Sequence, residues 1–147
     1  MTAELKTIVA NYSIFAVIWY VLQTYGHFLL FKKAKVNTMI AFIPVIREYK
    51  MFQMVWDNKI ISLVWIIGVI GLPLFVIGSE LKLQSIAWIG FVLSLIALVL
   101  SAIRAFYEVR AYNKGPGMAI AIIFVAPLAN IILGKSDADY QKNQILN

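Results

Sequence analysis

The sequence predicts an all-α integral membrane protein: a small helical bundle with three transmembrane helices plus two short, proline-broken interfacial or re-entrant segments. Composition is the first support, because 62% of the 147 residues are hydrophobic and only 14% are charged, whereas soluble domains have roughly 45–50% apolar and about 25% charged residues. The second support is the recurrence of apolar stretches near the roughly 20 residues that cross a bilayer core. One membrane domain covering residues 1–147 is therefore expected.

The first expected span covers residues 7–31. Its apolar run contains a few uncharged polar side chains and His27, and it stops at the basic pair Lys32 and Lys33. The run is longer than the apolar core of a cleaved signal peptide, and no small-residue cleavage site follows it. We therefore interpret it as a membrane anchor that stays in the protein.

The second apolar segment, residues 39–56, differs from a span because Pro44 and several charged residues interrupt it. From Pro44 onward, charged and apolar side chains recur at helical spacing on different faces. That pattern is typical of a helix that lies in the membrane interface or dips into it. This segment is predicted to be half-embedded.

Two further spans are expected at residues 60–78 and 86–103, neither of which contains a charged residue. The link between them is short, so they are predicted to form an antiparallel helical hairpin. Gly68 and Gly71 are expected to let the neighbouring helix approach closely. Arg104 follows the second span directly.

The last apolar segment, residues 118–134, has two possible structures. It contains Pro127 and Asn130 and follows the chain-breaking run Gly-Pro-Gly at 115–117, so it forms a short span or a re-entrant hairpin. Residues 135–147 form a polar tail. Both half-embedded segments follow a span that ends in basic residues and then carry a lysine, an apolar run and a proline. Such repeated discontinuous helices can bind solutes, although two independent interfacial segments would give the same pattern.

Basic residues predict the orientation. The positive-inside rule counts lysine and arginine in short loops. If the three spans cross the membrane and the second segment does not, nine of the thirteen basic residues fall on the same side of the membrane. We therefore expect a multi-pass protein of the bacterial inner (cytoplasmic) membrane, with cytoplasmic basic loops and the N-terminus outside. The C-terminus is inside if residues 118–134 are re-entrant and outside if they span. The nine residues are Lys32, Lys33, Lys35, Arg47, Lys50, Lys59, Arg104, Arg110 and Lys114.

No catalytic apparatus is visible in the sequence. Cysteine is absent and there is a single histidine, which excludes thiolate chemistry and multi-histidine metal sites within one copy. A Gly-x-Ser-x-Gly elbow and a phosphate-binding glycine loop are also missing. We expect no enzyme activity, no cofactor and no metal. The net charge of +6 indicates contact with anionic lipid headgroups rather than with nucleic acid. The expected partners are the bilayer and a membrane protein or further copies of this chain.

Five polar residues are the candidate functional positions. His27 could relay protons or face a cavity, or it could hydrogen-bond a neighbouring helix. Arg47 and Glu48 form either a cluster that faces a cavity or partner, or the solvated stripe of an interfacial helix. Arg104 either pairs with Glu108, one turn further on, or anchors the end of a span. The five candidates are His27, Arg47, Glu48, Arg104 and Asn130.

Several short motifs resemble a bacterial membrane family of unknown function that is often described as signal peptidase I-like. The run from Ala41 to Phe52 is similar to that family's Ala-x-Ile-Pro segment, although Arg47-Glu48 stands where Tyr-Asn is usual. The C-terminal motifs Asn-Lys-Gly-Pro-Gly at 113–117, Phe-Val-Ala-Pro at 124–127 and Ile-Leu-Gly at 132–134 also resemble it. The resemblance implies a membrane topology and proximity to protein export. It implies no peptidase activity, because the serine- and lysine-bearing catalytic domain is not in this sequence.

These observations lead to three functional hypotheses. The first is a non-enzymatic accessory or structural subunit of a membrane complex, linked to secretion or envelope biogenesis. The alternative is a small solute or ion transporter, or a channel formed by oligomerisation. The third is an immunity protein against a membrane-active peptide.

Overall fold

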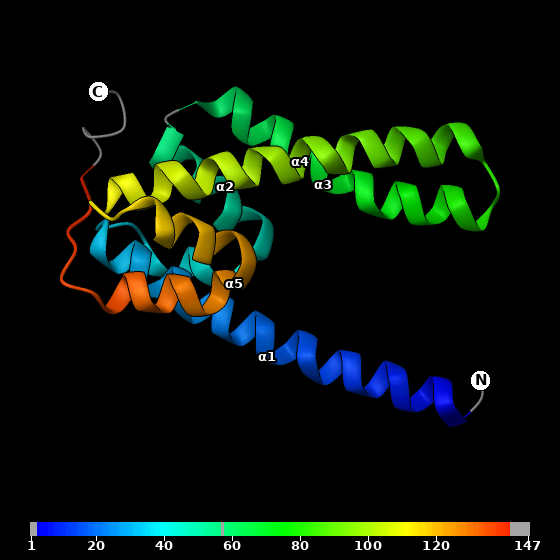
Figure 1. Cartoon of the computed structure of the whole chain (residues 1–147), viewed down its shortest axis with the longest axis horizontal. Coiled ribbons are helices and arrows are strands. Elements are labelled where there is room, and N and C mark those ends of the chain that lie inside the picture. The colour runs from blue at the N-terminus through cyan, green and yellow to red at the C-terminus, as the bar shows by residue number, and fades with distance from the viewer. Residues whose placement is uncertain (1–2, 57, 142–147) are drawn as a thin grey trace.

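The computed structural model describes the backbone of residues 3–56 and 58–141, and within these ranges the side chains from Ser13 onward. Over this part, the regular elements are all helices, as predicted. Four helices are long and apolar enough to cross a membrane by length and composition. Three of them contain the predicted spans, and the fourth contains residues 118–134, for which a short span was one of the two expected structures. The end of the predicted polar tail, residues 142–147, lies outside the described residues. Figure 1 shows the elements, which are α1 (Ala3–Lys33), η1 (Thr38–Phe42), α2 (Pro44–Trp56), α3 (Lys59–Glu80), α4 (Gln84–Ala111) and α5 (Pro116–Lys135).

After α1 the chain turns back along its own path. α1 ends with Lys32 and Lys33 in its last turn, where positive side chains favour the C-terminal end of the helix dipole. η1 then runs back beside α1, so that the Tyr20 hydroxyl donates to the carbonyl of Phe42 at 2.6 Å. Pro44 starts α2, a position that suits its fixed φ and missing N–H. The predicted segment 39–56 is therefore a hairpin of two helices rather than one.

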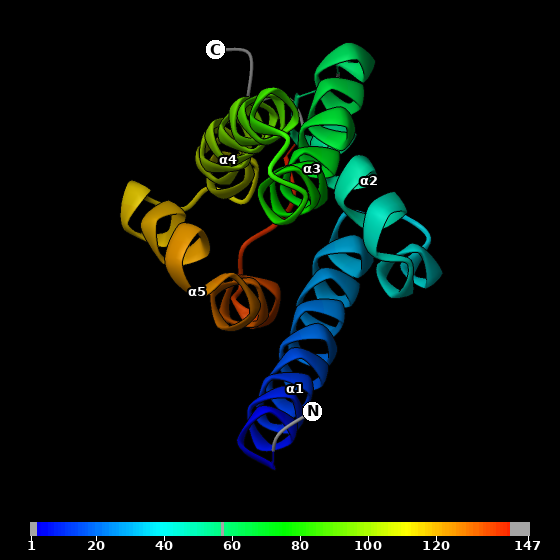
Figure 2. The ribbon, with the colours of Figure 1, turned by 90° about the vertical axis from the view of Figure 1, so that its right-hand side faces the viewer.

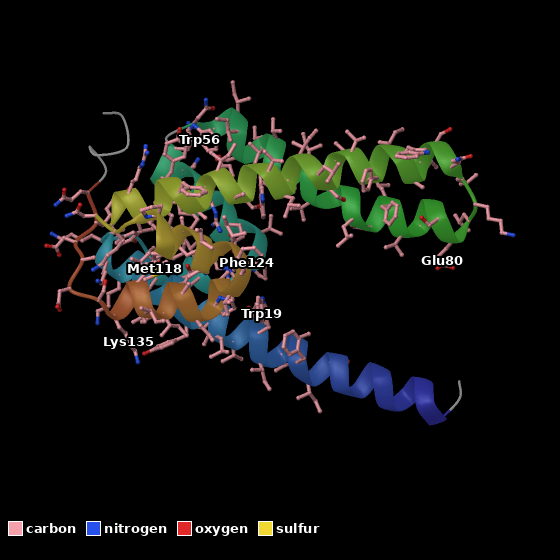
Figure 3. The ribbon with its side chains drawn as sticks, in the orientation of Figure 1. Trp19, Trp56, Glu80, Met118, Phe124 and Lys135 are labelled. Atoms are coloured by element: carbon pink, nitrogen blue, oxygen red, sulfur yellow. The ribbon has the colours of Figure 1, made fainter. Side chains whose placement is uncertain are left out.

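We call the end of the bundle that carries Lys32, Lys33, Arg110 and Lys135 the basic end. α2 returns to this end, because the hydroxyl of Tyr140, which follows α5, donates to the carbonyl of Met54 at 2.7 Å. The opposite end carries the turn between α3 and α4, next to Glu80 (Figure 3). The separation of Lys82 from the main group of basic residues agrees with the predicted loop arrangement.

α3 and α4 form the predicted antiparallel hairpin, and the predicted glycines lie in their interface. A Cβ built on Gly71 would lie 2.6 Å from the carbonyl oxygen of Gly90, so only glycine permits this approach of the two backbones. Trp65 also donates from Nε1 to the hydroxyl of Ser101 at 2.8 Å. α4 is longer than the span predicted at residues 86–103, because the helix continues through Arg104 to Ala111.

α5 is broken in its middle and turns back. Val125 has non-helical angles (φ −136°, ψ 48°), and Pro127 cannot donate the hydrogen bond that would continue the helix across this point. Figure 3 places Phe124 at the turn, farther from the basic end than Met118 and Lys135, and Figure 2 shows the two halves at an angle. Both ends of α5 therefore lie at the basic end, where Gln141 N–H donates to the carbonyl of Ala111 at 2.7 Å. The backbone of α5 therefore has the shape of a hairpin within the bundle.

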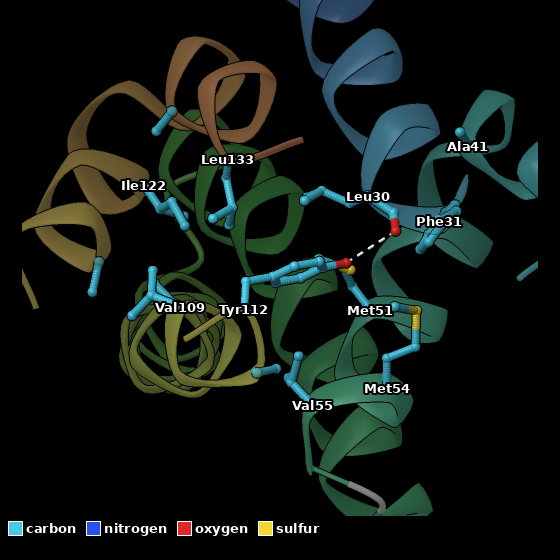
Figure 4. Packing of buried hydrophobic residues seen from close by; sticks show 14 residues of the cluster. Leu30, Phe31, Ala41, Met51, Met54, Val55, Val109, Tyr112, Ile122 and Leu133 are labelled. Carbon is cyan, nitrogen blue, oxygen red and sulfur yellow. Dashed lines mark hydrogen bonds between the residues drawn. The ribbon is translucent and has the colours of Figure 1, made fainter. Parts of the chain in front are cut away.

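The hydrophobic core fills the basic half of the bundle (Figure 4). Tyr112 is fully buried at its centre, and its hydroxyl donates to the carbonyl of Leu30 at 2.9 Å. Beyond this core, α1 and the α3–α4 hairpin diverge (Figure 1). Their apolar side chains are exposed there; Ile14 and Phe15, for example, are each 60% exposed. Such a surface needs lipid or another protein to cover it. The main core side chains are Leu30, Phe31, Met51, Met54, Val55, Val109, Tyr112, Ile122 and Leu133.

Candidate functional site

Four of the five candidate residues meet between α1, α2 and α4. Glu48 is at the centre: its Oε2 accepts from Arg104 Nη1 at 2.8 Å, and its Oε1 accepts from Arg47 Nε at 3.2 Å. The same Oε1 lies 3.4 Å from Nε2 of His27, which is fully buried. We call these four residues, His27, Arg47, Glu48 and Arg104, the charged cluster. The fold brings them together from three separate parts of the chain.

The polar face of α2 points inward, towards α1. Arg47 is only 6% exposed, and its Nη1 donates to the hydroxyl of Thr24 at 3.1 Å and to the carbonyl of Ala41 at 3.3 Å. Its guanidinium also lies over the Tyr20 ring, 5.8 Å from the ring centroid. The alternative of a solvated stripe on an interfacial helix is therefore wrong for Arg47, because η1 and α1 cover that face.

Arg104 is an interior residue of α4 and not an anchor at its end. Besides its bond to Glu48, it lies over the Phe52 ring at 5.4 Å, and its Nη2 is 4.0 Å from Oε2 of Glu108. The pairing with Glu108 that the sequence suggested is thus present, but Glu48 is the closer partner. Burial disfavours the charged form of Glu48, yet the positive charge of Arg104 and of the other groups around it outweighs burial and lowers the pKa of Glu48 to about 2.

Glu108 also belongs to this site. Its side chain is fully buried, and the sequence named it only as a partner of Arg104. The signal that identifies it is its spacing of four residues from Arg104, which places both on one face of α4. Besides His27, the site therefore has two arginines and two glutamates.

Asn130 lies beside the cluster, and no hydrogen bond joins its amide to the cluster among the described residues. It is fully buried in the second half of α5 and packs against α1 at Gly26, where an added Cβ would come within 2.8 Å of the Asn130 Cβ. Gly26 precedes His27, so Asn130 approaches the same level of α1. The fifth candidate is therefore a neighbour of the site.

Several buried polar atoms around the cluster have no hydrogen-bond partner among the described residues. Buried polar groups in proteins are nearly always hydrogen-bonded to protein, water or ligand. Their concentration at one level of the bundle therefore indicates bound water or a polar ligand there. These atoms are Gln23 Oε1, His27 Nε2, Arg104 Nε, both carboxylate oxygens of Glu108, and both amide atoms of Asn130.

The cluster can be approached from one side. A groove of about 510 Å³ on the side away from the basic end reaches Gln23 and Arg47. Towards the basic end, the hydrophobic core closes the path: Phe31, Met51 and Tyr112 each lie about one helical turn beyond a polar residue of the site and are fully buried. The other residues that line the groove are Phe15, Ala16, Trp19 and Tyr20.

The site is suited to binding and to proton exchange. It offers guanidinium donors, carboxylate and imidazole acceptors, and a wall of aromatic rings. Among the described residues there is no group of three or more histidine, cysteine or acidic side chains that could hold a metal ion.

The fold and the site together define a class: a helical chain with multi-pass membrane character, two turned-back hairpins, and a buried charged cluster between α1, α2 and α4. Comparison with protein families, with curated proteins and with solved structures finds no match. The resemblance to the signal peptidase I-like family therefore stays a prediction from the motifs quoted above.

Proposed function

We propose that this protein binds a small polar solute or an ion inside the membrane and passes it across, as a transporter or as a channel formed by oligomerisation. The observation that carries the proposal is the charged cluster, which lies within the bundle and is reached by a groove from the side away from the basic end. Ionisable side chains at membrane depth are costly, and they commonly mark solute, ion or proton pathways. No chemical step at the cluster is needed, so the proposed activity is non-enzymatic.

The two hairpins support this proposal. Each turns at a proline-bearing segment, and each places a buried polar residue three positions after the proline: Arg47 after Pro44, and Asn130 after Pro127. In many transporters, discontinuous helices at corresponding positions form the substrate site near the middle of the membrane. Irregular backbone at that depth is tolerated where protein or a water-filled cavity covers it.

The proposed orientation has the basic end in the cytoplasm and the N-terminus outside, in a bacterial inner membrane. The support is the predominance of lysine and arginine at the basic end, as the positive-inside rule requires. In this orientation the groove opens towards the outer side, and the hydrophobic core closes the inner side.

Flux into liposomes tests the proposal. Purified protein is reconstituted and assayed with a panel of ions and small polar solutes, alongside Arg47→Gln and Glu48→Gln. Flux of one class of solute, lost in both variants but kept in Glu80→Gln at the exposed α3–α4 turn, is the expected result. If the wild-type protein passes nothing across a broad panel, the proposal fails.

A second candidate function is an accessory subunit of a membrane complex, with a role in secretion or envelope biogenesis as the family resemblance suggests. The observation that favours it is the exposed apolar surface of α1 and of the α3–α4 hairpin where these elements diverge. Purification in gentle detergent at native expression level, followed by mass spectrometry, tests it. A stoichiometric membrane partner would support this function, and a protein that purifies as a monomer without partners would exclude it.

A further inference from the structure

The hydrogen bonds of His27 fix where one of its protons lies. Nδ1 is 2.9 Å from the carbonyl oxygen of Gln23, and a carbonyl only accepts, so Nδ1 carries a hydrogen. In a neutral imidazole, Nε2 is then an acceptor. This nitrogen faces Oε1 of Glu48 at 3.4 Å.

Glu48 cannot supply the missing hydrogen while it is paired with the arginines. Its two oxygens accept from Arg47 and Arg104, which is the bonding of an ionised carboxylate, an acceptor-only group. Two acceptors therefore face each other inside the bundle. One proton on Nε2 would convert this contact into a charge-assisted N–H···O bond.

Charged groups from two other helices surround His27. α2 contributes Glu48 and Arg47, and α4 contributes Arg104 and Glu108. The loss of hydration on burial opposes a positive charge on His27 most strongly; Arg104 and Arg47 oppose it too, whereas the negative charge of Glu48 favours it. Gln23 of α1 and Asn130 of α5 are uncharged polar groups at this level, and both have amide atoms without a hydrogen-bond partner among the described residues. Glu48 is the charged group whose carboxylate faces Nε2 directly, so removing its charge should weaken proton binding at His27.

We propose that His27 and Glu48 form a reversible proton-binding site, so that the proton is the coupling or transported ion of this membrane protein. The proton arrives from water in the groove beside Gln23 and Arg47, binds Nε2 of His27, and leaves by the same route. No other bond is made or broken, and the site gains one positive charge when loaded. The coupling role rests on the proposed transport function, whereas proton binding itself does not depend on it.

His27 is the single histidine of the chain, so its side chain can be followed without assignment. Protein purified with a tag that lacks histidine and labelled with ¹⁵N-histidine is placed in lipid nanodiscs, and imidazole ¹⁵N shifts are recorded from about pH 8 to about pH 2.5, a range that extends well below the ordinary histidine value. We expect Nε2 to pass reversibly from unprotonated to protonated while Nδ1 stays protonated. Removing the counter-charge with Glu48→Gln should move the Nε2 midpoint at least about one unit lower, a tenfold loss of proton affinity. Glu80→Gln is the matched control and should leave the midpoint unchanged.

Three results would overturn the inference: an Nε2 signal that does not respond to pH, a midpoint that Glu48→Gln leaves unchanged, or a hydrogen found on Nε2 in place of Nδ1. If Glu48→Gln does not fold, Glu48→Asp replaces it. This variant keeps the negative charge but moves it farther from His27, so we expect a smaller downward shift of the Nε2 midpoint. Liposome flux separates this inference from the proposed function. If His27 titrates but the protein passes no solute, only the proposed transport function is refuted. If the protein passes a solute but His27 does not titrate, only the proton site is refuted.

Discussion

Arg104 and Glu48 are joined by a hydrogen bond of 2.8 Å although 56 residues separate them in the chain. The bond ties α4 to α2 inside the bundle and sets the position of the first hairpin against a candidate membrane-spanning helix. A buried charge that loses its partner is strongly destabilising, more so than the intact pair is stabilising. Removing one member of the pair should therefore change the stability of the protein by a measurable amount.

The first prediction concerns this ion pair. Glu48→Gln should lower the free energy of unfolding by about 3–5 kcal/mol, because it leaves two arginines buried beside a neutral group. Adding Arg104→Gln to that variant should cost less than the sum of the single changes. Denaturant unfolding in mild detergent measures each value. Strictly additive effects would show that the two residues do not interact, and Glu80→Gln serves as the exposed control, with a change within about 0.5 kcal/mol.

A second prediction tests the contact between α3 and α4. Gly71→Ala places a methyl group 2.6 Å from a backbone oxygen of the opposite helix, so we expect a loss of about 1–3 kcal/mol, typical of overpacking. Gly117→Ala is the matched change, since nothing lies within 4 Å of its Cβ position; it should be neutral or slightly stabilising. Thermal unfolding of both variants provides the comparison. Equal melting temperatures would contradict the close approach.

Lys33 gives a third prediction because it holds the end of α5. Its ammonium group donates to the carbonyls of Leu133, Ser136 and Ala138, the last at 2.7 Å. Lys33→Met should remove about 1.5–3 kcal/mol of stabilisation per charged hydrogen bond lost. It should also raise hydrogen exchange at residues 133–138. The neighbouring Lys32→Met, at an exposed position, should leave exchange in that segment unchanged; a similar increase in both variants would argue against a specific role for Lys33.

The long apolar helices were predictable because a long uncharged apolar run is typical of a helix that crosses a membrane. Residues 60–78 and 86–103 therefore lie within α3 and α4, and the glycines of α3 indicated the hairpin. The C-terminal boundary of α4 was not predictable by the same rule. Arg104 looked like the end of a span, but Glu48 and Glu108 neutralise it inside the protein, so the helix continues.

The site was predictable only as a set of residue types. Helical periodicity showed that α2 has a polar face, yet periodicity cannot say whether that face meets water or protein. The structure turns it inward, where Arg47 reaches Thr24 and Ala41. The role of Glu48 as the central acceptor depends on His27 of α1 and Arg104 of α4. These residues are far apart in the chain, and residue spacing cannot show which distant side chains meet. The turn at Val125 in α5 was one of two possibilities, since Pro127 predicts a break but not its angle.

The fourth prediction concerns the path of α5. The chain contains no cysteine, so single cysteines report their own accessibility. Lys114→Cys and Asp137→Cys, on either side of α5 at exposed positions, should react with an impermeant thiol reagent from the same side of a vesicle. Ser79→Cys, at the turn between α3 and α4, should react from the opposite side. Labelling of the first two variants from opposite sides would mean that α5 crosses the membrane as a straight helix.

Water access to the charged cluster is the central claim, and one measurement tests it most directly. Gln23→Cys, in the groove, and Ile18→Cys, on the apolar surface of α1 at 53% exposure, are treated with an impermeant thiol reagent in sealed vesicles of known orientation. Ile18 lies more than one turn nearer the N-terminal end of α1, and so nearer the outer membrane surface in the proposed orientation. If distance from that surface alone decided reactivity, Ile18→Cys would be labelled more readily than Gln23→Cys. We predict that Gln23→Cys reacts, only from the side opposite the basic end, and that Ile18→Cys does not. A Gln23→Cys variant that stays unlabelled from both sides, or reacts only from the basic side, would contradict the account.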